Sequence, residues 1–359
     1  MKKIFVNICI ALLIFSALLT SCNKKTIDTP IYNNEIGKGV FVLNEGSFTY
    51  ANSSLTFYDN VADTVGNNIF YKANMAPIGD IAQSLCLHDN SLFIVVNNSG
   101  YVYKVDAKTV KYQAKLDNLN SPRFMIPVGD GKAYISDLER TGLWVVDINE
   151  MKVTGFVETG NTTDRMIRIG DKLFVCNWSN YYLPETSNET VQVIDIASDS
   201  YIADIKVSKE PNSMVLDSAG MLWVLCSGGY SGEKEPALYR IDPATCSVVD
   251  VFMFDTQYYP SSLAIDNTGN ILYFLNGGYN TLDLYSMSIN DKTLPDTPFI
   301  TAGSRNFYNV AVSPENGDIY VIDVKNYTQN GEVFRYTSDG NLITSFTAGI
   351  IPNYMLFNY

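Results

Sequence analysis

Hydrophobic and polar positions along the chain recur as pairs of short apolar segments. In each pair, an apolar segment leads into a turn of Gly, Asn or Asp, and a second apolar segment ends in Asn, Asp or Ser. Apolar segments bounded by such turn residues are typical of antiparallel strands. The pair occurs six times: SLCLHDNSLFIVVN, FMIPVGDGKAYISD, RMIRIGDKLFVCN, SMVLDSAGMLWVLCS, SLAIDNTGNILYFLN and NVAVSPENGDIYVID.

These pairs repeat with a nearly constant period. A third strand such as GLWVVD or ALYRID follows each pair, and a fourth such as KVTGFVETG or YIADIKVS follows after a turn. Four antiparallel strands in 40 to 50 residues are typical of one blade of a β-propeller. The chain is therefore predicted to be all-β, with four-stranded antiparallel blades. The second strands end 40, 40, 50, 49 and 47 residues apart, at Asn97, Asp137, Asn177, Ser227, Asn276 and Asp323.

Residues 39–80 supply a seventh repeat that lacks its first strand. GVFVLNEG matches the second strands, SSLTFYD the third and NNIFYKAN the fourth. The last residues of the chain, PNYMLFNY, match first strands such as PNSMVLD and PSSLAID. We therefore predict seven blades, without amphipathic helices, in a ring that the C-terminal strand closes by pairing into the first blade. Closure removes an open sheet edge that would otherwise favour aggregation.

The N-terminal segment MKKIFVNICIALLIFSALLTSC has two lysines, a long apolar run and small residues before Cys22. This order is typical of a secretory signal peptide and not of a membrane span. Its last four residues, LTSC, resemble the lipobox of bacterial lipoproteins, which implies cleavage before Cys22 and lipid attachment to its thiol. We expect a signal peptide at residues 1–21, a lipidated Cys22 with a flexible tether at residues 22–36, and the propeller at residues 37–359.

Charge and cysteine content narrow the functional classes. The formal net charge is −13, and removal of Lys2 and Lys3 with the signal peptide makes it −15. An acidic protein repels phosphates, so nucleic acid is not an expected partner. The cysteines of the propeller are widely spaced without a C-x-x-C motif, which favours free buried thiols over disulfides or a zinc site. They are Cys86, Cys176, Cys226 and Cys246.

Blade topology predicts where a ligand would bind. The first strand of a blade crosses the ring and the second strand returns, so loops entering first strands and loops leaving second strands share one face, called here the loop face. Aromatic rings in these loops offer a large contact area with a polar tip. Individual aromatic residues could instead only wedge neighbouring blades together. The predicted ligand-binding residues are Glu45, Phe48, Tyr50, Asp80, Arg123, Asp164, Arg165, Trp178, Tyr181, Tyr182, Tyr230, Tyr258, Tyr279, Arg305, Phe307, Tyr327 and Tyr354.

Other polar residues have structural explanations. Short oxygen side chains recur where third strands end, and such side chains hydrogen-bond turn backbones. His88 is the only histidine, and the topology places it on the face opposite the loop face. A Ser-His-Asp triad or a histidine metal centre is therefore not expected on the loop face. The recurring residues are Asp59, Asp106, Asp147, Asp195, Asp242, Ser288 and Thr337.

Over the LTSC segment and all seven repeats, the chain resembles the YncE-like, YVTN-type β-propeller lipoproteins of Bacteroidetes. The stretches FVLNEGSF and LFVCNWSNYY, with the Asn- and Tyr-rich loops after second strands, make it similar to the BtuG-type surface lipoproteins that bind cobalamin. The resemblance implies a non-enzymatic capture protein without metal or cofactor, which binds cobalamin or another corrinoid. It also implies that the ligand passes to a TonB-dependent outer-membrane transporter.

The same resemblance implies a lipid anchor in the outer membrane, facing the cell surface. Surface lipoproteins of this group often carry acidic residues after the lipidated cysteine, whereas Asn23-Lys24-Lys25 follow here, so a periplasm-facing anchor stays open. Three other functions also stay open. They are glycan capture by the same aromatic face, a protein-interaction scaffold, and an enzyme such as a propeller lactonase or lyase.

Overall fold

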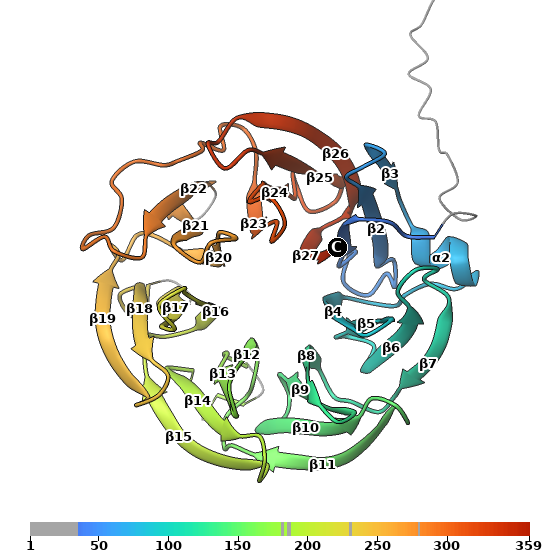
Figure 1. Cartoon of the computed structure of the whole chain (residues 1–359), viewed down its shortest axis with the longest axis horizontal. Helices are drawn as coiled ribbons and strands as arrows, with labels where there is room; N and C mark the ends of the chain where they lie inside the picture. Colours follow the sequence, from blue (N-terminus) through green and yellow to red (C-terminus); the bar gives the residue numbers. More distant parts are fainter. Residues whose placement is uncertain (1–34, 181–182, 185–187, 230–231, 279–280) are drawn as a thin grey trace, which may run out of the picture. The chain divides into compact units, whose positions relative to one another are not determined.

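The computed structural model describes residues 35–180, 183–184, 188–229, 232–278 and 281–359. Their strands form seven separate sheets, which are arranged as blades around a common axis (Figure 1). Cavities lined by the innermost strands form a central channel along this axis. The prediction of an all-β, seven-bladed propeller is confirmed. Listed from the innermost strand outward, the strands are β27 (Pro352–Asn358), β1 (Gly39–Asn44), β2 (Ser54–Asp59) and β3 (Thr64–Gly66) in blade 1; β4 (Ala82–His88), β5 (Ser91–Val96), β6 (Tyr101–Asp106) and β7 (Tyr112–Leu116) in blade 2; β8 (Pro122–Gly129), β9 (Lys132–Asp137), β10 (Gly142–Asp147) and β11 (Lys152–Glu158) in blade 3; β12 (Met166–Ile169), β13 (Lys172–Cys176), β14 (Thr190–Asp195) and β15 (Ser200–Lys206) in blade 4; β16 (Pro211–Leu216), β17 (Leu222–Cys226), β18 (Ala237–Asp242) and β19 (Ser247–Met253) in blade 5; β20 (Ser261–Ile265), β21 (Ile271–Gly278) and β22 (Thr281–Ser288) in blade 6; and β23 (Phe307–Val312), β24 (Ile319–Asp323), β25 (Asn330–Tyr336) and β26 (Leu342–Ile350) in blade 7.

The C-terminal strand closes the ring as predicted. β27 pairs antiparallel with β1, from Gly39 opposite Asn358 to Leu43 opposite Tyr354. Figure 1 shows the last segment of the chain lying innermost in the first blade. The first blade is therefore assembled from both ends of the described chain. Within the described residues, every blade has an innermost strand that pairs with the next strand outward.

The fourth strand differs from the prediction in two blades. In blade 1, NNIFYKAN was expected to be the fourth strand, but the fourth strand is the short β3 and the segment forms helix α2 (Ile69–Asn74). Asn68 precedes the helix in a left-handed conformation (φ 57°), and Ile69 and Phe70 are buried. The outermost position of a blade has packing neighbours on one side only. A helical turn there can therefore bury the side chains of Ile69 and Phe70 as well as a strand would.

Blade 6 has three strands, and an isolated bridge between Leu284 and Ile300 takes the place of the fourth. The segment that follows β22 contains Pro295 and Pro298. Proline lacks the N–H that a ladder needs, so the two prolines weaken strand pairing in this segment.

Side chains from adjacent blades form the hydrophobic core. Second strands such as β1 and β24 are buried at every position, which explains their continuous apolar sequences. One core cluster joins Val40 and Tyr58 of blade 1 to Tyr320 and Ile322 of blade 7. All seven clusters lie within residues 36–357, so the propeller carries its own core. Within the described residues, no helix is long and apolar enough to cross a membrane.

The carboxylates that end third strands cap turns, as predicted. Asp106 accepts hydrogen bonds from the backbone N–H groups of Lys108 and Thr109, and Asp147 accepts them from Asn149 and Glu150. Hydrogen bonds from these turns lower the pKa of Asp147, because they stabilise its charged form. These residues are therefore structural.

Candidate functional site

Register shifts interrupt the start of the innermost strand in six of the seven blades. A β-bulge places two residues opposite one and redirects a side chain. In each of these blades, one residue at the shift lines the mouth of the central channel on the loop face. Arg165 takes the same place in blade 4, where Cys176 donates its N–H to the Arg165 carbonyl at 2.8 Å. The residues in the other six blades are Gln83, Arg123, Asn212, Ser262, Tyr308 and Asn353.

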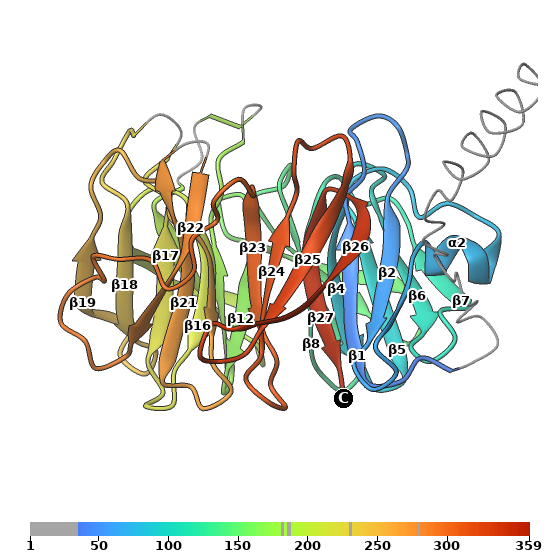
Figure 2. The ribbon, with the colours of Figure 1, turned by 90° about the horizontal axis from the view of Figure 1, so that it is seen from above.

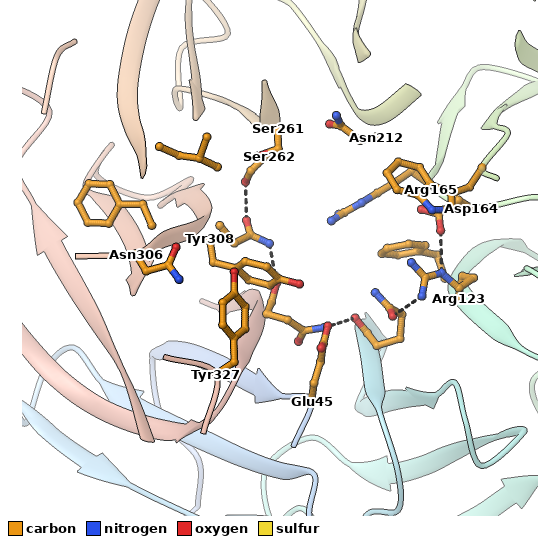
Figure 3. Close-up of a pocket in the computed structure, with 17 residues that line it drawn as sticks. Glu45, Arg123, Asp164, Arg165, Asn212, Ser261, Ser262, Asn306, Tyr308 and Tyr327 are labelled. Atoms are coloured by element: carbon orange, nitrogen blue, oxygen red, sulfur yellow. Dashed lines mark hydrogen bonds and ion pairs between the residues drawn. The ribbon is translucent and has the colours of Figure 1, made fainter. Parts of the chain in front are cut away.

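These seven side chains surround a cavity of about 300 Å³, called here the mouth pocket. Loops that follow second strands complete its wall with Glu45, Trp178 and Tyr327. Figure 3 shows Glu45, Tyr308 and Tyr327 on one side of the pocket, and Arg123, Asp164 and Arg165 on the other. The predicted loop face therefore does contain a cavity, and every blade contributes to it.

Three side chains on one wall hold each other in place. Arg123 donates from Nε to Asp164 at 2.7 Å and from one terminal nitrogen to Gln83 at 2.6 Å. The Asp164 side chain is 5% exposed, so this ion pair is largely shielded from water. A buried, hydrogen-bonded ion pair fixes geometry because breaking it would leave an unpaired buried charge. Arg123 and Asp164 therefore shape the pocket and are already paired without a ligand.

The neighbouring part of the wall, in blade 1, carries an acid and a buried amide. The Asn353 amide donates to Glu45 Oε1 at 2.9 Å, and its own oxygen is buried without a partner within the described residues. Burial raises the pKa of Glu45, although the Asn353 hydrogen bond and the charge of Arg123 oppose the rise. Glu45 lines the mouth pocket, so its carboxylate can accept a hydrogen bond from a ligand.

Arg165 is the pocket's available cation. Its guanidinium lies over the Phe124 ring at 4.4 Å and near the Tyr354 ring at 5.7 Å. No carboxylate pairs with it in the part of the chain that the structure describes. Stacking on aromatic rings holds the group in place while its N–H donors stay free for an acceptor. Arg165 can therefore receive a carbonyl, carboxylate or phosphate oxygen.

Below the mouth pocket, the channel continues between the innermost strands. A segment of about 400 Å³ shares Phe124 and Arg165 with the mouth pocket and is lined farther along by Met166, Met214 and Leu356. The channel thus changes from a polar mouth to a wall with more apolar side chains.

The predicted ligand-binding residues separate into three groups. The structure brings seven of them together at the mouth pocket: Glu45, Arg123, Asp164, Arg165, Trp178, Phe307 and Tyr327. Six lie elsewhere: Phe48, Tyr50, Asp80, Tyr258, Arg305 and Tyr354. Four, with the lipidation residue Cys22, lie outside the described residues: Tyr181, Tyr182, Tyr230 and Tyr279.

The six residues that lie elsewhere have other environments. Phe48 and Tyr50 are exposed on the loop between β1 and β2, and Tyr258 packs on a core cluster. Asp80 accepts hydrogen bonds from Thr49 and Asn98.

The last two of these six are held by aromatic contacts. The Arg305 guanidinium stacks over Phe334 at 4.3 Å, away from the mouth pocket. Tyr354 faces the channel below the mouth pocket, where burial raises the pKa of its phenol.

Sequence reasoning missed several lining residues. Gln83, Asn212, Ser262 and Asn353 look like ordinary polar residues at the start of a strand, so loops alone did not reveal them. An alignment of the innermost strands would have found them, because each is the second residue of its strand. These strands begin with AQS, PNS, SSL and PNY.

His88 and the cysteines of the propeller also have defined places in the structure. His88 ends β4, whose first residues lie at the mouth, so His88 lies at the far end of the strand. All four propeller cysteines are free thiols. Among the residues that the structure covers, no group of three His, Cys, Asp or Glu side chains could hold a metal ion.

The fold and the site together define a seven-bladed β-propeller with a polar pocket at the mouth of its channel. The chain belongs to the family described as domain of unknown function DUF5074, whose model matches residues 38–354. No curated protein matches the chain significantly.

Solved structures match the fold at low sequence identity. A quinoprotein alcohol dehydrogenase-like protein from Bacteroides thetaiotaomicron is 17% identical with a TM-score of 0.69, over 91% of this chain and 80% of the other. A putative 6-phosphogluconolactonase from Bacteroides fragilis is 12% identical with a TM-score of 0.62, over 90% and 98%. At these identities the similarity shows the fold alone. None of the matches tests the resemblance to BtuG-type proteins, which stays a prediction.

Proposed function

We propose that the protein is a non-enzymatic capture protein whose mouth pocket binds a neutral, amide-bearing small molecule, and that this molecule is a corrinoid such as cobalamin. The polar wall of the mouth pocket, with the Glu45 carboxylate as an acceptor and the Arg165 guanidinium as a donor, carries the proposal. A primary amide matches this arrangement, because its N–H₂ can donate to Glu45 while its carbonyl accepts from Arg165.

Apart from Glu45 and Arg165, the side chains of the pocket wall are neutral or paired, and they suit amides better than strongly charged groups. Arg123 and Asp164 neutralise each other, and the other channel-facing side chains at the strand starts include Gln83, Asn212 and Asn353. Neutral hydrogen-bonding groups bind neutral partners without a large cost of charge desolvation. Corrinoids carry several primary amides around their periphery, which suits this wall.

Pocket size limits the binding mode. About 300 Å³ is at the small end of ligand pockets, so only part of a corrinoid enters it. The ring lies across the mouth, where Trp178 and Tyr327 supply aromatic surface. His88, the sole histidine, lies at the other end of β4, so the cobalt receives no protein imidazole.

The location is part of the same proposal. Cleavage before Cys22 and lipidation of its thiol attach the protein to the outer membrane, and residues 23–36 link the lipid to the propeller. Exposure at the cell surface allows capture before transfer to a TonB-dependent transporter. Labelling of intact cells with an antibody against the propeller distinguishes surface exposure from a periplasm-facing anchor.

Co-elution tests the ligand assignment. Residues 23–359 are mixed with cyanocobalamin and passed through a desalting column, and the absorbance of the bound corrinoid is measured in the protein fraction. The proposal expects co-elution that Arg165→Gln and Glu45→Gln weaken. A neutral trisaccharide in excess should not compete. Absence of corrinoid from the protein fraction, or displacement by the sugar, contradicts the corrinoid assignment.

A further inference from the structure

A second cavity, of about 390 Å³, lies where the ring closes between blades 1 and 7. Its wall comes from the start of β2, the junction of β3 and α2, the start of β25 and the end of β26. Figure 2 shows these segments beside each other, with α2 on the outer flank of blade 1. The cavity shares no lining residue with the mouth pocket. It is called here the flank pocket.

The flank pocket has no acid or base in its wall. Its twelve lining residues include four asparagines and Tyr71, and none is Asp, Glu, Lys, Arg or His. The chain as a whole is 18% charged and strongly acidic. A concave surface that excludes all these charges, yet is rich in amides, matches a ligand that is neutral and rich in hydrogen-bonding groups.

Several of the amides have unused hydrogen-bonding capacity. Asn67 is committed to the fold, because it accepts from Thr56 at 2.7 Å and donates to the Thr347 carbonyl at 3.1 Å. Asn52 uses only its oxygen, which accepts from the Ser47 N–H at 2.7 Å. The side chains of Asn68 and Asn330 make no hydrogen bond within the described residues. Two whole amides and one amide N–H₂ group therefore remain for a ligand.

Tyr71 adds an aromatic platform to the wall. Its side chain is 43% exposed, although its neighbours Ile69 and Phe70 are buried in the core. Helix α2 thus fixes the backbone of Tyr71, and Met75 donates its N–H to the Tyr71 carbonyl at 2.7 Å. A rigid exposed ring beside free amides costs little entropy on binding.

We propose that the flank pocket binds a neutral oligosaccharide. The apolar C–H face of a pyranose packs on the Tyr71 ring, and its hydroxyl groups exchange hydrogen bonds with Asn52, Asn68 and Asn330. Hydroxyls both donate and accept, as amides do, so the two sets of groups complement each other. This site is independent of the mouth pocket and of the corrinoid proposal.

Affinity electrophoresis tests the flank pocket. Residues 23–359 are run in native gels with and without a soluble neutral polysaccharide, and the panel is starch, galactomannan, xyloglucan and mixed-linkage β-glucan. The proposal expects at least one polysaccharide to retard the chain. Tyr71→Ala should weaken that retardation at least about tenfold, as loss of an aromatic anchor commonly does. Asn68→Gly keeps the left-handed backbone and removes the amide, and should weaken it about two- to tenfold.

Two matched controls locate the effect. Tyr112→Ala removes a tyrosine of similar exposure on β7, outside the pocket, and should leave retardation unchanged. Arg165→Gln alters the mouth pocket and should also leave it unchanged. Retardation should not change between about 50 and 500 mM salt, because the wall carries no charge to be screened. The proposal is overturned if no polysaccharide of the panel retards the chain, if Tyr71→Ala binds like the native chain, or if Arg165→Gln abolishes retardation.

Discussion

Deletion of residues 351–359 should remove most of the stability of the propeller. This segment contains all of β27, which supplies the innermost strand of blade 1 and pairs with β1 at six positions. Its removal exposes the inner edge of β1 and weakens the contact between blades 1 and 2, because Asn353 also donates to the carbonyls of Ala82 and Gln83. The deletion therefore breaks the ring at its closure.

The cost follows from the contacts that are lost. About six ladder hydrogen bonds contribute about 0.5–1.5 kcal/mol each. Met355 is 8% exposed, so its burial contributes about 1.5–3 kcal/mol, and the partly buried Tyr354 and Leu356 contribute about half as much each. The total is on the order of 10 kcal/mol, which is comparable with the whole stability of a typical domain.

Thermal unfolding followed by circular dichroism measures the effect. The truncated chain should lose its cooperative transition or melt more than about 10 °C below residues 23–359, since each kcal/mol shifts the midpoint by about 2–4 °C in chains of 150–250 residues. Met355→Ala is the graded control, and it should keep a cooperative transition while costing about 2–4 kcal/mol. If the truncated chain melts within a few degrees of the intact propeller, β27 does not hold the ring closed.

Glu45→Gln should raise the melting temperature at pH 7.5, and the gain should shrink toward pH 4. Burial raises the pKa of Glu45, so the folded state favours its protonated form, and stability falls as pH rises through the window above 4.5. A variant that is less stable at pH 7.5, or a gain that is the same at both pH values, would contradict this. Cys86 should react slowly with Ellman's reagent at pH 8 in the native protein and quickly after unfolding, because burial raises its pKa to about 12. Fast reaction in the native state would show that the channel wall does not shield the Cys86 thiol.

The repeat pattern was sufficient to predict the number of blades and the closure of the ring. Second strands are buried on both faces, so their apolar runs are long and easy to align, and the match of PNYMLFNY to the other first strands identified its position. Outermost strands gave weaker signals, because they pack on one face only. That is why α2 was predicted to be a strand and why the missing fourth strand of blade 6 was not foreseen.

The site was predictable only in part, for a geometric reason. Topology correctly assigned loops such as those of Glu45 and Trp178 to the mouth. The register shifts that direct Asn212 and Asn353 toward the channel depend on which residue is left unpaired in a ladder, and apolar periodicity does not encode this. Arg305 shows the reverse case, because this charged loop residue stacks on Phe334 and does not line the mouth pocket.

Calorimetric titration of two variants with cyanocobalamin tests the central claim, that the mouth of the channel on the loop face is the binding site. Trp178→Ala combined with Arg165→Gln removes aromatic surface and the available cation from the mouth pocket, and it should weaken binding by about 2 kcal/mol or more. His88→Ala changes only the far end of β4 and should bind like the native chain. Native affinity in the double variant, or loss of binding in His88→Ala, would place the ligand elsewhere and contradict the account.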